Sequence, residues 1–235
     1  FGVRALAAVP RASGAQMWRE THELANRSML FVAVVMGLTG DIMVTQAATQ
    51  AQRIVGDLGL VGPAFLQLLV REFAPVIVAL MVAARYGAGV AAQIATMQVT
   101  EQVDALRLAG IDEVEHLVSP RLIAGLCGML PVVVLGGAVA YAAGAVAAHV
   151  RFDVGWHSYF NLRGLTGADV VVGVAKAVAF GLAVPLVAAF VGMQARGGAP
   201  AVGAATTRAV VGASMAVLAL DLGVGIVGYL VSGLV

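Results

Sequence analysis

Long apolar runs separated by short polar segments dominate the pattern of hydrophobic and polar positions along this chain. Five of these runs are long enough for a helix to cross the hydrocarbon core of a membrane, which takes about 20 residues. They are too long for strands. Because backbone polar groups in lipid must be satisfied internally, the pattern predicts an all-α membrane protein with five transmembrane helices. The expected spans are Met29–Ala48, Ala64–Met97, Leu122–Ala148, Val170–Gln194 and Ala209–Val235.

The composition supports this interpretation. Of 235 residues, 60% are hydrophobic and only 11% are charged, and the mean hydropathy is +0.94. A soluble domain usually carries about 25% charged residues, so there is too little polar surface here to coat a water-soluble globule. The net charge of +1 gives no electrostatic basis for binding nucleic acid.

The segment before the first span, residues 1–27, is expected to form an interfacial helix. Trp18, Leu24 and several alanines offer an apolar side, and four arginines are available to meet lipid headgroups. A flexible tail is the alternative. Residues 28–235 are expected to form a single five-helix transmembrane domain.

Basic residues in the loops predict the orientation of the chain. With the N-terminus inside and the C-terminus outside, eight arginines fall on the cytoplasmic side and three on the outer side. The outer loop after the third span contains Trp156, Tyr159 and Phe160, which are expected to anchor a short helix at the outer interface. The eight cytoplasmic positions are Arg4, Arg11, Arg19, Arg27, Arg107, Arg121, Arg196 and Arg208, and the three outer ones are Arg53, Arg151 and Arg163.

A polar connector between the second and third spans is the most informative segment. Small or apolar residues recur along it at helical spacing, and charged residues lie off that stripe. Thr100 is expected to cap the helix at its N-terminus, and Gly110 to end it. The interpretation from spacing alone stays open between a solvated loop helix and a coupling helix that docks on a cytoplasmic motor. The stripe is Val99, Val103, Leu106 and Gly110, and the residues assigned to coupling are Thr100, Glu101, Gln102, Asp104 and Arg107.

The connector lies within a longer family-specific stretch. Residues 71–121 read REFAPVIVALMVAARYGAGVAAQIATMQVTEQVDALRLAGIDEVEHLVSPR, and residues 203–221 read GAATTRAVVGASMAVLALD. Both stretches closely resemble the MlaE/YrbE family of ABC-transporter permeases, and the likeness covers most of the chain from Met29 onward. Family members often carry Glu where this chain has Gln93, so a charge is lost there while hydrogen bonding is retained.

The resemblance implies a function and a set of partners. Permeases of this family work with MCE-domain proteins to move phospholipid or related lipids between the inner and outer bacterial membranes. It implies a homodimer in the inner membrane, a cytoplasmic ABC ATPase on the coupling helices and an MCE ring, expected to be hexameric, on the periplasmic face. It also leaves room for a small STAS-domain protein. The lipid is expected in a cavity between the two permease subunits.

Charged residues inside the spans are the candidates for lipid binding. A charge in the bilayer costs about 2.5–3.5 kcal/mol even on the lenient insertion scale, so such residues face an interior, water or a partner. We expect Arg71, Glu72 and Lys176 to line the outward cavity, with the cations meeting the lipid phosphate and Glu72 within reach of Lys176. The alternative is a structural salt bridge between the second and fourth helices.

Other residues in the spans receive different roles. Arg85 and Asp221 lie deeper and are expected to be structural, in an interhelical pair or a helix-kinking hydrogen bond. Met43 is expected to contact acyl chains because methionine adapts to irregular shapes, with ordinary packing as the alternative. Asp41 is expected to face the cavity or a water pocket.

Several chemistries are not supported by the sequence. The four histidines are scattered and form no metal spacing, and no Ser-His-Asp or Cys-His arrangement can be argued. No G-x-x-x-x-G-K-[ST] motif is present, so ATP and Mg²⁺ are expected in a partner ATPase and no cofactor in this chain. The chain is therefore expected to be a transporter permease and not an enzyme.

Two rival functions remain at this point. An ion-gradient-driven secondary transporter would use Glu72, Lys176 and Asp221 as a relay, but the inverted repeats typical of such proteins are not evident. A membrane scaffold would anchor an MCE protein without transport. Loss of both ATPase binding and transport on changing Glu101 or Asp104 would exclude the scaffold.

Overall fold

Five helices in the described part of the chain, residues 14–54 and 56–232, are long and apolar enough to cross a membrane. The structure, a computed structural model, therefore confirms the predicted all-helical membrane architecture. All five helices begin before the apolar runs that predicted them, and the first three also end after those runs. The membrane-length segments are Arg19–Ile54, Val61–Val99, Glu113–Phe152, Gly167–Met193 and Ala199–Leu230.

The N-terminal segment and the first span are one continuous helix, α2 (Gly14–Ile54). No break marks the expected boundary at residue 27. Residues 1–13 of the expected interfacial helix lie outside the described residues.

The second span changes its winding twice along its length. Both π-helical segments carry the charged residues of this span, since one contains Arg71 and Glu72 and the other contains Arg85. Single π-turns inside α-helices are frequent at functional sites. The span consists of α3 (Val61–Leu68), η2 (Leu69–Phe73), α4 (Ala74–Val82), η3 (Ala83–Gly87) and α5 (Ala88–Val99).

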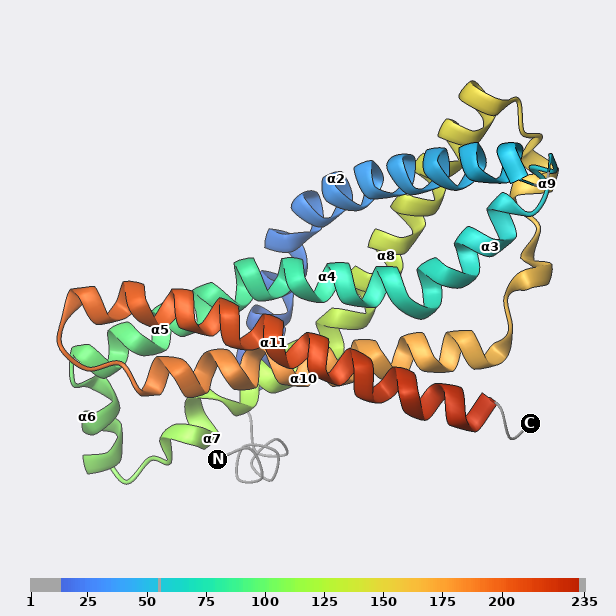
Figure 1. Cartoon of the computed structure of the whole chain (residues 1–235). Helices are drawn as coiled ribbons and strands as arrows, with labels where there is room; N and C mark the ends of the chain where they lie inside the picture. Colours follow the sequence, from blue (N-terminus) through green and yellow to red (C-terminus); the bar gives the residue numbers. More distant parts are fainter. Residues whose placement is uncertain (1–13, 55, 233–235) are drawn as a thin grey trace.

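The connections lie at two opposite ends of the spans, which are called here the α6 end and the α9 end (Figure 1). The α6 end carries the polar connector, and the α9 end carries the expected short helix at Trp156, which is confirmed. The remaining elements are α6 (Gln102–Leu108), α7 (Glu113–Leu117), α8 (Ser119–Phe152), α9 (Trp156–Tyr159), η4 (Leu162–Gly164), α10 (Gly167–Met193) and α11 (Ala199–Ser232).

Close helix packing holds the bundle together. α2 lies along α8, and α10 packs against α8, α11 and α5. At the α8–α10 crossing, a Cβ on Gly125 would collide with the carbonyl oxygen of Gly181, so only glycine allows the backbones to approach this closely. The large buried side chains of this core include Met36, Ile94, Met129 and Phe180. This packing brings charged side chains on different spans within contact of one another.

Candidate functional site

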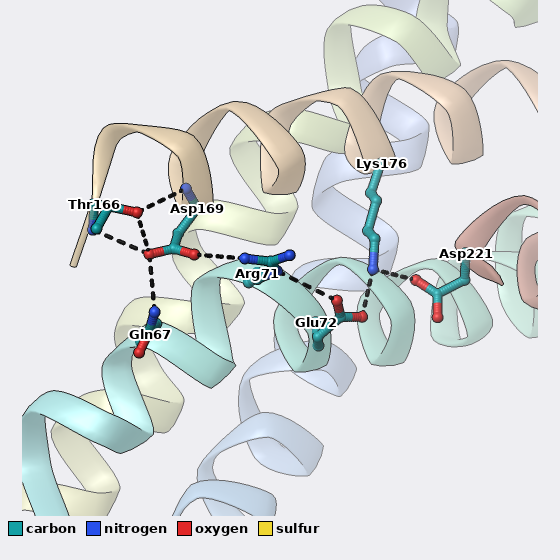
Figure 2. A network of polar contacts seen from close by, with 7 residues as sticks. All are labelled: Gln67, Arg71, Glu72, Thr166, Asp169, Lys176 and Asp221. Atoms are coloured by element: carbon teal, nitrogen blue, oxygen red, sulfur yellow. Dashed lines mark hydrogen bonds and ion pairs between the residues drawn. The ribbon is translucent and has the colours of Figure 1, made fainter. Parts of the chain in front are cut away.

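A chain of charged side chains crosses from the second span to the fourth and fifth spans (Figure 2). Lys176 on α10 contacts the carboxylate of Glu72 on η2, and its ammonium lies 2.7 Å from Oδ1 of Asp221 on α11. The expected Glu72–Lys176 contact is thus confirmed. Asp221, which was expected to lie deeper, is at the level of Lys176.

Lys176 is completely buried, whereas its two partners are partly exposed. An unpaired ammonium in such a place would lose its hydration without compensation, and two carboxylates replace that hydration here. The network as a whole has two cations and three carboxylates, so it carries a net negative charge. In this conformation a phosphate can reach Lys176 only if one of the carboxylates moves.

Asp169 extends the network beyond the residues that were expected. It lies at the start of α10 in a capping box with Thr166, whose hydroxyl donates to the Asp169 carboxylate at 2.7 Å. The other carboxylate oxygen lies 3.1 Å from Nη1 of Arg71, and Gln67 donates to Asp169 at 3.2 Å. Arg71 is therefore held at the end of α10 and lies 3.9 Å from Glu72.

The sequence contained a local signal for Asp169 but no signal for its partner. Thr-x-x-Asp before an apolar run is a capping box, and the interpretation placed it outside the fourth span. Its contact with Arg71 is a tertiary one across 98 positions of the chain, which no local pattern encodes. Arg85 is exposed and has no ion pair within the residues described, so its structural role stays a prediction.

An apolar groove lies between α2 and the second span, toward the α9 end, and its lining residue Phe73 is next to Glu72 in the chain. It measures about 260 Å³ and is open on one side. Met43 lines it from α2, and Phe65, Leu68 and Phe73 line it from the second span. Asp41, on the same helix as Met43, forms an ion pair at 3.1 Å with Arg151 of α8. The groove offers the apolar walls that an acyl chain requires.

The polar connector forms α6 and α7 at the α6 end. Val103 is fully buried where α6 lies against α5 and α7, whereas Glu101, Gln102 and Asp104 are exposed. Gly110 adopts a φ of +77°, and the amide of Ile111 donates to the carbonyl of Leu106, which ends the helix as predicted. One side of α6 is thus buried through Val103, and its charged side is exposed.

The expected cap at Thr100 is wrong. The Thr100 hydroxyl donates to the carbonyl of Thr96 at 2.8 Å, so it closes the last turn of α5. Glu101 occupies the position before α6 with a φ of +60° and forms no side-chain cap bond. A threonine hydroxyl at the end of a helix can bond to the carbonyl four residues earlier, and it is then not available to cap the next helix.

Arg107 and Leu108 differ in what they offer a partner. Arg107 pairs with Asp104 at 3.1 Å and with Glu113 of α7 at 3.0 Å, and its hydrogen bond to Glu113 raises the pKa of its guanidinium. Leu108 is 90% exposed at the last position of α6. Leu108 lies off the predicted buried stripe, and this position could have indicated its exposure from the sequence, but the interpretation did not use it. Leu108 and the nearby Ile111 are both exposed, so apolar surface lies beside the acidic residues of α6.

Metal chemistry finds no support among the described side chains, where no group of three or more His, Cys, Asp or Glu residues is placed to hold an ion.

Comparisons with known proteins identify relatives across almost the whole chain. The family described as "Permease MlaE" matches residues 17–227. A probable ABC transporter permease protein of Rickettsia felis is 35% identical over 193 residues, covering 81% of this chain and 74% of the relative. The intermembrane phospholipid transport system permease protein MlaE of Haemophilus influenzae is 31% identical, covering 83% and 72%. Protein TRIGALACTOSYLDIACYLGLYCEROL 1, chloroplastic, of Arabidopsis thaliana is 32% identical, covering 83% and 57%.

Proposed function

This chain belongs to the MlaE permease family, and we propose that it moves phospholipid or a related lipid between the inner and outer membranes as the permease of an MCE-associated ABC transporter. One observation carries the lipid assignment. An apolar groove open on one side is lined by Phe73, the chain neighbour of Glu72 in the charged network, so apolar and charged surfaces follow each other along η2, as a molecule with acyl chains and a charged headgroup requires.

The size of the groove favours a homodimer. Ligand pockets usually measure about 300–1,000 Å³. The groove of about 260 Å³ lies below that range and lacks a wall on one side, so a second copy facing it would complete the cavity. In this arrangement Met43 contacts acyl chains, and Arg71 and Glu72, both partly exposed, meet the headgroup. Lys176 joins them when Glu72 or Asp221 moves away.

The energy comes from a cytoplasmic ABC ATPase docked on α6. Support for this contact comes from the exposed residues Glu101, Gln102, Asp104 and Leu108 on a helix seated by Val103. ATP binding closes the two ATPase subunits and displaces α6, which shifts the spans. Lipid is moved because it binds the two states of the cavity with different affinity.

The predicted orientation determines on which side of the membrane each remaining partner binds. With the N-terminus in the cytoplasm of a bacterium, the α6 end faces the ATPase and the α9 end faces the periplasm. An MCE-domain protein then receives or delivers lipid at the α9 end, and a small STAS-domain protein binds on the cytoplasmic side where the system includes one.

Reconstitution tests the proposal. The chain is purified from its own host with the proteins that bind it, and native mass spectrometry identifies the ATPase, the MCE protein and the bound lipid. The complex is then placed in liposomes with a fluorescent phospholipid, and ATP-dependent transfer to the MCE protein is measured. An ATPase subunit unable to hydrolyse ATP is the control.

Each rival function predicts a different result. Transfer that follows a proton or sodium gradient without an ATPase would establish the secondary transporter. Binding of the MCE protein with no transfer under any condition would establish the scaffold.

A further inference from the structure

A second polar cluster, separate from the network in Figure 2, lies at the α6 end and is centred on Arg121. We propose that Arg121 is the positioning residue that transmits the displacement of α6 and α7 to α2 and the second span. This inference rests on the proposed function, because the displacement comes from the ATPase.

Arg121 is the third residue of α8, and its guanidinium contacts three other elements. Nη1 donates to the carbonyl of Leu117, at the end of α7, over 2.5 Å. Nη2 donates to Oε1 of Gln93, on α5, over 3.0 Å. Nε lies 3.5 Å from Oε1 of Glu20, on α2. The planar fork of arginine allows these contacts together, which the single ammonium of a lysine cannot reproduce.

Glu20 continues the connection to a further element. Its second carboxylate oxygen accepts a hydrogen bond from the hydroxyl of Tyr86 at 3.2 Å. Tyr86 belongs to η3, the π-helical segment in the middle of the second span. The Arg121–Glu20 pair therefore joins α7 and α8 to α2 and to both η3 and α5 of the second span.

The guanidinium of Arg121 is buried, so its hydrogen-bond partners matter. Arg121 is only 7% exposed, and a buried cation that loses its acceptors costs far more than a surface one. A cavity of about 30 Å³ adjoins it, lined in part by Tyr86, Gln93 and the buried Ser28. A cavity of that size holds about one water. Glu20, Tyr86 and Gln93, which line this cavity, can thus exchange a hydrogen bond within the cluster for one to water when the elements move.

The position of Arg121 in the chain connects the cluster to the coupling helix. α7 lies between α6 and α8, and Arg107 of α6 pairs with Glu113 of α7. Leu117, the acceptor for Arg121, ends that same short helix. A displacement of α6 is therefore passed through α7 to the Leu117 carbonyl and from there to the guanidinium.

The test uses the complex of the chain with its ATPase subunit in liposomes. Phosphate release and transfer of a fluorescent phospholipid are measured together, and their ratio gives the lipid moved per ATP. Arg121→Gln, Arg121→Lys and Glu20→Gln are compared with Arg196→Gln. Arg196 is an exposed cation in the α10–α11 connection at the same end, and it has no ion pair in the described part.

In Arg121→Lys and Arg121→Gln, ATP hydrolysis is expected to stay within about twofold while lipid moved per ATP falls about tenfold. Glu20→Gln is expected to show the same loss, and Glu20→Gln with Arg121→Gln no further loss, because the two residues act as one unit. Arg196→Gln keeps the wild-type ratio.

Two results would overturn the inference. Arg121→Lys with a wild-type ratio would show that the fork is not needed. Failure of both Arg121 variants to assemble with the ATPase would show a purely structural role. The proposed function fails in a different way, because the wild-type chain itself would then show no ATP-dependent transfer.

Discussion

The ammonium of Lys176 lies 2.7 Å from Oδ1 of Asp221, and the lysine has no exposed surface. Its other contact is the carboxylate of Glu72, so one buried cation joins the second, fourth and fifth spans. Cations buried in this way are costly to leave unpaired but are not by themselves a large source of stability. The arrangement is suited to a switch, because a shift of either carboxylate changes what Lys176 can bind.

Lys176→Met is expected to lower the free energy of unfolding by about 1–3 kcal/mol, because it leaves two partly exposed carboxylates without their shared cation. Thermal unfolding of the purified protein in nanodiscs measures the effect. Adding Glu72→Gln and Asp221→Asn to Lys176→Met is expected to recover most of the stability without recovering lipid transfer. The matched control is Arg151→Gln, which breaks the exposed pair with Asp41 and is expected to cost at most about 1 kcal/mol.

Glu72→Lys reverses the charge between Arg71 and Lys176 and is expected to abolish lipid transfer while the protein still inserts normally. The reason is that three cations would then meet where the wild-type network is net negative. Membrane insertion and ATPase binding are assayed alongside transfer. Unimpaired transfer by an inserted Glu72→Lys protein would show that the pair only holds the helices together.

Those parts of the structure that depend on length and local chemistry were predictable from the sequence. The five spans follow from the bilayer thickness, and the end of α6 follows from Gly110. The Glu72–Lys176 contact was predictable because both residues had to lie at a similar depth and neither could remain unpaired. These inferences need no knowledge of how the helices cross.

The remaining features depend on tertiary placement. The π-helical winding at Arg71 and Arg85 has no sequence signature in this chain, and it sets the directions in which their side chains point. Asp169 was recognisable only as a polar residue before a span, and its contact with Arg71 depends on the crossing of α10 and η2. The sequence predicted that the Thr100 hydroxyl would accept from an amide of α6, but in the structure it donates to the carbonyl of Thr96 in α5.

Met43→Trp is expected to fill the apolar groove and exclude the acyl chain, because the indole ring occupies the space that Met43 leaves open between α2 and α3. Losing the apolar contacts of an acyl segment with the groove, about 1–3 kcal/mol, corresponds to a loss of roughly 5- to 150-fold in lipid affinity. Lipid that co-purifies with the protein is quantified by mass spectrometry. Ile42→Trp is the control, since Ile42 is exposed on the same helix but does not line the groove. Equal lipid content in both variants would exclude this groove as the binding site.

Leu108→Ser is expected to weaken ATPase docking by about 30-fold, the effect of losing a contact worth about 2 kcal/mol at the centre of an interface. The 90% exposed leucine contributes little to the fold, so thermal stability should stay within about 0.5 kcal/mol of wild type. Affinity for the purified ATPase subunit is measured with the permease in nanodiscs. Leu162→Ser changes an exposed leucine at the α9 end and should leave docking unchanged. Equal affinities for the two variants would place the docking surface elsewhere.

Gln93→Glu and Gln93→Leu separate the need for an acceptor from the need for a charge at α5. Gln93 accepts a hydrogen bond from Nη2 of Arg121 at 3.0 Å, and a carboxylate can accept the same bond with added charge. Gln93→Glu is therefore expected to keep lipid moved per ATP and to hold stability at or above the wild-type level. Gln93→Leu removes the acceptor from a buried guanidinium and should cost about 1–3 kcal/mol of stability. Both are measured by thermal unfolding and by the transfer assay. A Gln93→Glu protein that loses transfer while a Gln93→Leu protein retains it would show that the neutrality of this position, and not its hydrogen bond, is what Arg121 requires.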